Sequence, residues 1–349
     1  DNFLAKYKDH FDNFVIINKI INIPFVIRNP IILNEIAICF ITKKYVREDI
    51  SKAIHYYSLA AKFNYPESNY NLGIIYMMSD QRDYNKAAHY MTLAANQNHS
   101  NAQFFLGIIY ILGLSGEKNI NKYLDYMNLS ANQNNLEALY DLGIFYCEGQ
   151  YCQINMQKAI HYFTLASNLN DSRSSLILGV IYGKGYCWQK DINKSIHYLT
   201  LAANKNDPTA QFYLGITYLQ NRSINQYIEK AIKYLTLSAN QNYSEAQFNL
   251  GVIYDSGKYV KRDIKLAFFY YSLSANQNNM YSQMNLANIY YEGKYVKQDI
   301  NKAFHYYSLA ANQNNQIAMI NLGIILLKGE NGEIDIKRAI EYFELAAEQ

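Results

Sequence analysis

The chain has 349 residues, and half of them are apolar, so the chain is long enough to bury a large core. Its 32 Lys and Arg residues against 29 Asp and Glu leave a formal net charge of +3, far from the basic excess that binding to a phosphate backbone requires. This charge balance predicts no nucleic-acid partner. No run of 18 apolar residues or cleavable leader is visible, so the sequence predicts no membrane span.

Residues 1–30 form the first predicted segment and do not fit the pattern of the rest of the chain. Apolar side chains recur there at helical spacing, at Phe3, Tyr7, Phe11, Phe14 and Ile17. We therefore expect residues 1–30 to be an N-terminal helical segment that caps the first element of the following domain.

Residues 31–349 are built from one repeated unit. A Leu-Gly pair marks each copy and recurs every 36 residues from Leu106-Gly107 to Leu322-Gly323, with Leu286-Ala287 as one variant. Leu72-Gly73 lies 34 residues before the series, and Ile36-Ala37 marks a degenerate first copy. A tyrosine followed three residues later by leucine, such as Tyr306 and Leu309, occurs in every copy. The count is nine copies.

Each copy has the spacing of two helices. In the first half of one copy, Ala102, Leu106, Ile109 and Tyr110 share one face of a 3.6-residue helix, and the second half of another copy shows the same pattern around Tyr306. A single hairpin of this size buries neither apolar face completely, so neighbouring copies must stack. The predicted fold is an all-α solenoid of about nine 36-residue helix-turn-helix repeats, each with a helix A and a helix B.

Short polar residues mark the ends of the second helix. Asparagine follows each of the eight internal helices B, where a left-handed residue ends a helix, as at Asn134 and Asn314. The glycine of the Leu-Gly pair lies inside helix A, and we expect it to allow close approach of helix B, with slightly wider packing at Ala287. One copy, with Tyr227 at this position, lacks a capping residue before helix B. The predicted N-caps of the other helices B are Asp49, Asp83, Asn119, Asn155, Asp191, Asp263, Asp299 and Asp335.

The unit from Ala246 to Asn278 resembles the Sel-1-like repeat, a relative of the tetratricopeptide repeat. The matching residues are Ala246, Leu250, Gly251, Tyr254, Gly257, Asp263, Ala267, Tyr270, Tyr271 and Ala275. The resemblance implies a right-handed superhelix with the helices A on its concave side, and a role as an adaptor that holds other proteins. The paired cysteines of the disulfide-linked branch are absent, so hydrolase activity suggested for that branch does not carry over.

One position of helix A, directly before the conserved leucine, changes character from copy to copy. Aromatic or aliphatic anchors with an aspartate and flanking amides could hold an extended peptide, with Phe105, Ile177 and Tyr213 forming an apolar patch around Asp141. The alternative is ordinary variation at a half-exposed position. The predicted partner-binding residues are Asn71, Phe105, Asp141, Ile177, Tyr213, Asn249, Asn285 and Asn321.

Other candidates favour structural interpretations. Five histidines share one helix-B position, His55, His89, His161, His197 and His305, but neighbouring copies are too far apart for these side chains to converge on a metal. The abundant tyrosines are expected to fill space between helices. The segment "GKGYCWQKD", Gly183 to Asp191, is interpreted as a turn between helices because it lacks the terminal residues and preceding strand of a phosphate loop.

No motif predicts catalysis, a metal or a cofactor. Four scattered cysteines, Cys39, Cys147, Cys152 and Cys187, form no disulfide framework or zinc pattern and favour a reducing, cytoplasmic compartment. The leading hypothesis is a non-catalytic scaffold that binds a protein or peptide. Alternatives are a structural component embedded in a large, for example cytoskeletal, assembly, and the regulatory repeat region of a larger protein such as an enzyme. The final copy is expected to meet further chain or a partner, because its last helix lacks a polar cap.

Overall fold

The computed structural model of the protein describes residues 24–42, 49–78, 82–186, 190–220, 225–332 and 334–348. Within these residues all extended regular structure is α-helical. The chain divides into two compact units, Asp1–Leu169 and Asn170–Gln349, and each is described by itself. Most of the predicted cap over residues 1–30 lies outside the described residues. The structure describes only a short helix of this segment and its connection to the first hairpin, so the cap stays a prediction.

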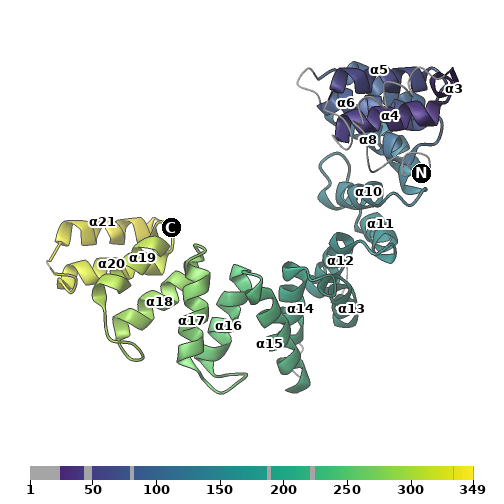
Figure 1. Ribbon diagram of the computed structural model, residues 1–349. Helices are drawn as coiled ribbons and strands as arrows, with labels where there is room; N and C mark the ends of the chain where they lie inside the picture. The colour runs from purple at the N-terminus through teal and green to yellow at the C-terminus, as the bar shows by residue number, and fades with distance from the viewer. Residues whose placement is uncertain are drawn as a thin grey trace, which may run out of the picture. The chain divides into compact units, whose positions relative to one another are not determined.

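The first unit contains a short helix followed by four antiparallel hairpins, in each of which a helix A precedes a helix B (Figure 1). Val26 of the short helix is buried in the core of the first hairpin. The helices are α3 Pro24–Ile27, α4 Pro30–Thr42, α5 Ile50–Ala61, α6 Pro66–Met78, α7 Tyr84–Ala95, α8 Ser100–Leu112, α9 Ile120–Ala131, α10 Leu136–Glu148 and α11 Met156–Asn168.

The second unit continues the same order with five hairpins. Even-numbered helices are helices A, and odd-numbered helices from α5 onward are helices B. The helices are α12 Ser172–Lys184, α13 Ile192–Ala203, α14 Pro208–Gln220, α15 Asn225–Asn240, α16 Ser244–Ser256, α17 Ile264–Ala275, α18 Met280–Glu292, α19 Ile300–Ala311, α20 Gln316–Lys328 and α21 Ile336–Ala347.

The buried clusters join one repeat to the next. In the first unit, Met91 of α7 packs in one cluster with Leu106 and Ile109 of α8. In the second unit, Leu235 of α15 does the same with Leu250 of α16. Each hairpin therefore completes its core on its neighbour, which is the physical reason that the repeats form a solenoid.

The helix ends agree with the sequence. All eight predicted N-cap side chains accept a hydrogen bond from the backbone amide three residues later, as Asp299 does from Lys302. In the copy with Tyr227, α15 begins earlier, at Asn225, and extends over 16 residues. The eight asparagines after helices B have φ between 60° and 70°, which is the left-handed conformation that ends a helix.

The glycine of the Leu-Gly pair lies against helix B. A Cβ atom added to Gly143 would lie 2.4 Å from Cε1 of Phe163, and one added to Gly251 would lie 2.5 Å from Cδ1 of Tyr271. The predicted close approach is confirmed. Ala287 takes the equivalent place in the cluster with Tyr307, and the wider packing expected there stays a prediction.

The tyrosines fill the space between the two helices of a hairpin, as expected. The ring of Tyr146 on α10 stacks on Tyr162 of α11 with centroids 5.9 Å apart, and Lys158 Nζ lies 4.8 Å from the Tyr146 centroid. The same arrangement of two stacked rings and a lysine recurs at Tyr182, Tyr198 and Lys194 in the second unit. Most of these rings remain half-buried rather than fully enclosed.

A ladder of amides connects successive repeats. Gln133 Nε2 donates to Gln103 Oε1 at 2.7 Å and to Asn98 Oδ1 at 3.1 Å, and Gln313 makes the same pair of bonds to Gln283 and Asn278 at 2.8 and 3.1 Å. The bonds to Gln103 and Gln283 stay within one copy, whereas the bonds to Asn98 and Asn278 hold the glutamine of the recurring "NQN" to the preceding copy. Asn69, which replaces the buried glutamine in its own copy, leaves both atoms of its amide group without a partner.

Candidate functional site

The eight predicted partner-binding residues share one environment. Each lies one residue before the buried leucine of its helix A and is half-buried. Asn71, Phe105 and Asp141 belong to the first unit, and Ile177, Tyr213, Asn249, Asn285 and Asn321 belong to the second. The predicted apolar patch of Phe105, Ile177 and Tyr213 draws on both units, so its continuity stays a prediction.

In the first unit this position faces the preceding helix A. Asn71 Nδ2 on α6 donates to Asn34 Oδ1 on α4 at 3.2 Å. The Phe105 ring on α8 lies 6.1 Å from the Tyr70 ring on α6, centroid to centroid. These side chains therefore line the seam between successive helices A, which we call the helix-A surface.

In the second unit two cavities open on the corresponding seams. A larger cavity of about 410 Å³ lies between α16 and α18, with Asn285 on its wall. A smaller cavity of about 180 Å³ lies between α12 and α14, with Tyr213 on its wall. Asn249 instead turns back onto its own helix, where Nδ2 donates to the Glu245 carbonyl at 2.7 Å.

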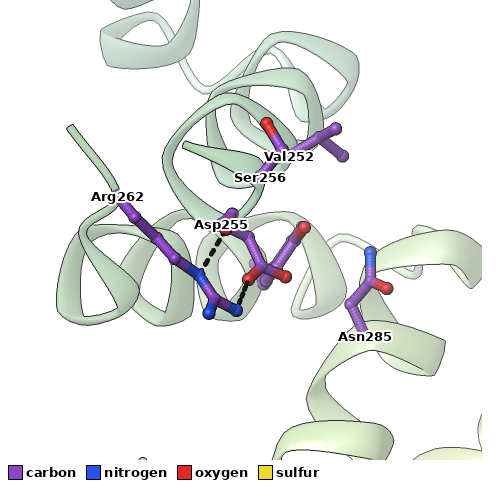
Figure 2. Close-up of a pocket in the computed structure, with 6 residues that line it drawn as sticks. Val252, Asp255, Ser256, Arg262 and Asn285 are labelled. Atoms are coloured by element: carbon purple, nitrogen blue, oxygen red, sulfur yellow. Dashed lines mark hydrogen bonds and ion pairs between the residues drawn. The ribbon is translucent and has the colours of Figure 1, made fainter. Parts of the chain in front are cut away.

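The larger cavity contains an internal ion pair. Arg262 reaches from the turn before α17 to Asp255 near the end of α16, while Asn285 faces this pair from α18 (Figure 2). Arg262 Nη2 donates to Asp255 Oδ1 at 2.8 Å, and its Nε donates to the Asp255 carbonyl at 2.6 Å. The hydrogen bond to the Asp255 side chain raises the pKa of the Arg262 guanidinium. The positive charge in this cavity is thus balanced by the protein itself.

The smaller cavity has a different charge. Lys184 at the end of α12 and Lys190 before α13 are both exposed and line the cavity, whose floor includes Leu199 of α13. The Lys184 ammonium lies 5.6 Å from the centroid of the Tyr186 ring. A hydrogen bond to the Tyr186 side chain raises the pKa of the Lys184 ammonium group.

Sequence reasoning missed these four charged residues. Lys184 and Lys190 lie within Gly183–Asp191, the segment interpreted as a turn. The structure corrects the start of this turn: Gly183 and Lys184 still belong to α12, and the turn begins at Gly185, which has φ 73°. A copy-by-copy comparison of the turns would have exposed the difference in charge, because a shift of two repeats places Lys190 at Arg262, Gly183 at Asp255 and Lys184 at Ser256.

The remaining candidates lie apart from the helix-A surface. The five histidines are exposed on the helices B. Each histidine ring packs edge-on against the tyrosine that follows it, as His197 does on Tyr198. No group of three or more metal-ligating side chains occurs among the described residues. Cys39, Cys147 and Cys152 form no disulfide among the described residues, and Cys187 lies outside those residues.

Helices long and apolar enough to cross a membrane are absent from the part of the chain that the structure describes.

Comparison with known proteins agrees with the repeat architecture. The model of the Sel1 repeat matches nine segments, residues 42–62, 66–99, 100–135, 136–171, 173–207, 208–243, 244–279, 281–315 and 316–349. The first match covers α5 but only the last residue of α4, in line with a degenerate first copy. The predicted all-α solenoid of nine helical hairpins is confirmed.

Two solved structures are similar over most of the chain. One is a protective antigen of uropathogenic Escherichia coli with an SLR fold, at 25% identity and a TM-score of 0.79, covering 92% of this chain and 69% of the other. The other is a Sel1 repeat protein from Oxalobacter formigenes, at 22% identity and a TM-score of 0.74, covering 92% of this chain and 90% of the other. The comparison with curated proteins finds no match.

Proposed function

The chain belongs to the Sel1 repeat family, and on that premise we propose that it is a non-catalytic scaffold whose helix-A surface binds a protein or peptide partner. Sel1 repeat proteins generally mediate protein–protein interactions. The observation that carries the proposal is the position of the two cavities: both open between successive helices A, and each includes one of the variable residues, Tyr213 or Asn285.

The chemistry of this surface suits an extended protein segment. Half-buried rings such as Phe105 and Tyr213 offer apolar contact area at low cost in side-chain entropy. Amides such as Asn285 can bond to both the amide and the carbonyl group of a peptide backbone. A surface whose residues alternate in this way along the repeats can recognise one segment at several points.

A protein partner also agrees with the charge of the chain. The net charge of +3 supplies little attraction for a nucleic acid. The few cysteines support a cytoplasmic location, where thiols stay reduced, as part of this proposal.

The test is capture of the partner by crosslinking and mass spectrometry from native material. We expect the double variant Phe105→Ala and Tyr213→Ala to lose the principal crosslinked partner, because both rings on the helix-A surface are truncated. The matched control is His161→Ala and His197→Ala, which truncates two exposed rings on helices B. Full partner recovery with the first variant would contradict the proposed function.

A second candidate function is a structural component of a large assembly that contacts partners on both faces. The helices B carry an exposed leucine in several repeats, with relative exposures of 47% for Leu129, 39% for Leu165 and 39% for Leu201. Exposed apolar side chains repeated along a surface favour contact with another protein. For this candidate, Leu165→Ser plus Leu201→Ser should release the protein from its native assembly under mild extraction, and unchanged retention would count against it.

A further inference from the structure

We propose that the smaller cavity of the second unit binds a carboxylate, supplied by an aspartate or glutamate side chain of the partner segment. The inference rests on the proposed function, since it names the chemistry that one part of the helix-A surface recognises. Its basis is a residue-by-residue comparison of two equivalent cavities in the same unit.

The two cavities are the same structural feature two repeats apart. Two copies of 36 residues make 72 residues, and this shift converts Arg262 into Lys190, Asp255 into Gly183 and Ser256 into Lys184. The other three residues that line the larger cavity also correspond to residues that line the smaller one. The chain therefore presents one site in two chemical versions.

In the larger cavity the carboxylate is part of the protein. Asp255 Oδ1 accepts a hydrogen bond from Arg262 at 2.8 Å, so the cationic side chain already has an anionic partner. A charge-assisted bond of this kind satisfies both groups. An external anion would have to displace Asp255 before it could bind Arg262.

In the smaller cavity the carboxylate is missing but the cation remains. Gly183 stands where the larger cavity has Asp255, Lys190 stands where it has Arg262, and Lys184 adds a second positive charge. The described lining of this cavity includes no acidic side chain. The residues that connect Tyr186 to Lys190 are Cys187, Trp188 and Gln189, none of which is acidic.

The acidic residue next in the sequence is already engaged. Asp191 caps α13 by accepting the amide hydrogen of Lys194 at 2.9 Å, and the Lys194 ammonium lies 3.7 Å from its other oxygen. The two lysines of the cavity therefore present positive charge to the solvent above it. An anion from outside can complete the site as Asp255 completes the larger cavity.

The size and the walls of the cavity indicate a side chain. Its volume of about 180 Å³ is below the roughly 300 Å³ at which pockets for drug-sized ligands begin. Leu199, Val180 and Ile216 provide apolar wall for a methylene stem, while Lys184 and Lys190 can meet the carboxylate. An extended segment lying across successive helices naturally directs alternate side chains into such pockets.

The packing beneath Gly183 leaves little room for an aspartate side chain at this position. A Cβ atom on Gly183 would lie 2.7 Å from Ser195 Oγ, which donates to the Gly179 carbonyl at 2.7 Å. The residue equivalent to Ser195 in the larger cavity is Ala267, which lacks the hydroxyl group. Introducing an aspartate at position 183 therefore requires the accompanying change Ser195→Ala.

The first test uses small probes and the whole protein. N-acetyl-glutamic acid α-amide, which carries only the side-chain carboxylate, is titrated while backbone amide shifts are followed by NMR. We expect saturable shifts at Lys184, Lys190 and Tyr213, and none with the N-acetyl-glutamine amide. The variant Lys184→Gln plus Lys190→Gln should bind roughly fivefold more weakly, as expected for exposed charge-assisted bonds. Lys328→Gln is the matched control, because Lys328 occupies the position of Lys184 but pairs with Glu330 at 3.4 Å.

The second test exchanges the two chemical versions. Gly183→Asp with Ser195→Ala should supply an internal carboxylate and weaken probe binding roughly fivefold. Asp255→Ala with Ser256→Lys should free Arg262, add a second cation and create a new set of saturable shifts around residue 262. Circular dichroism of each variant, with the native helical signal as the requirement, separates loss of the site from loss of the fold.

Three outcomes would overturn the inference. The first is binding of the glutamine analogue as tight as that of the glutamate probe. The second is undiminished probe binding by both Lys184→Gln plus Lys190→Gln and the Gly183→Asp graft. The third is tighter binding of N-acetyl-alanine or inorganic phosphate, which would assign the site to a chain terminus or a phosphate instead. Because the probes need no native partner, these results are independent of the crosslinking test of the proposed function.

Discussion

The interior of each hairpin and the helix-A surface differ in how much the repeats vary. Inside the hairpins, a Cβ atom added to Gly143 or to Gly251 would lie 2.4 or 2.5 Å from a ring atom of helix B, so both positions exclude a side chain in the same way. On the surface, equivalent positions hold residues as different as Phe105, Asp141 and Asn285. Close packing tolerates few side chains, whereas a half-exposed seam tolerates many. The fold can therefore be kept constant while its recognition surface changes from repeat to repeat.

The largest expected effect belongs to the hairpin interior. Gly143→Val should lower the free energy of unfolding by about 3 kcal/mol, because the new side chain overlaps the rigid ring of Phe163. Urea unfolding followed by circular dichroism measures the change. Gly107→Val is the control: its neighbour is the flexible Met127, at 3.1 Å from an added Cβ, so the loss should be smaller. Equal losses in the two variants would show that helix propensity, not packing, sets the cost.

The amide ladder should come next. Gln133→Ala removes the donor to Gln103 and Asn98, and it should cost about 1 to 2 kcal/mol because the buried Gln103 loses a partner. The same urea unfolding experiment measures it. Lys205→Ala, at the equivalent position of a copy without the glutamine, is expected to change little.

The reverse substitution sharpens this point. Asn69→Gln places the longer amide where Gln103, Gln211, Gln247 and Gln283 stand in other copies. Since both polar atoms of the Asn69 amide are buried without a partner, the longer side chain should reach Gln97 and stabilise the first unit. A decrease in stability would mean that the amide ladder contributes nothing at that seam.

The helix caps should give a smaller, pH-dependent effect. The backbone amide of Lys86 is the main cause that lowers the pKa of Asp83 below its ordinary value. A carboxyl group with a lowered folded-state pKa stabilises the fold above its unfolded pKa of about 3.9, and this stabilisation is lost as the pH falls through the lower folded value. Asp83→Asn keeps a capping acceptor, so its melting temperature should fall less than that of the native chain between neutral pH and pH about 2.5.

A matched change separates the cap from general charge effects. Asp125→Asn removes one carboxylate from an exposed position in the middle of α9. Its melting temperature should follow that of the native chain as the pH falls. If the two variants behave alike, the cap is not the source of the pH dependence.

The smallest effect on stability is expected at the helix-A surface. Tyr213→Asn introduces the residue found at this position in four other repeats, and it should change the free energy of unfolding by no more than about 0.5 kcal/mol. The same variant is expected to weaken partner recovery in the crosslinking experiment. A large loss of stability would show that Tyr213 belongs to the packed interior rather than to a recognition surface.

Much of the local structure was predictable because it repeats. A capping residue such as Asp299 and a left-handed asparagine such as Asn134 act on their own helix end, so their roles follow from neighbouring residues in the sequence. The eight positions of the candidate surface were predicted from their variability, and all eight are half-buried. Their roles in binding stay predictions, since recognition depends on a partner as well as on this chain.

The cavities and the amide ladder were not predicted, because both depend on residues from different repeats. The period of 36, the two helices in each copy and their caps follow from the sequence alone, since each depends on local spacing and local hydrogen bonds. Only the stacked structure places Gln133 beside Asn98 of the preceding copy, or Asn285 opposite Asp255 and Arg262. Charges at separate positions of a repeat acquire meaning when packing brings them to one cavity, and packing is a property of the whole fold.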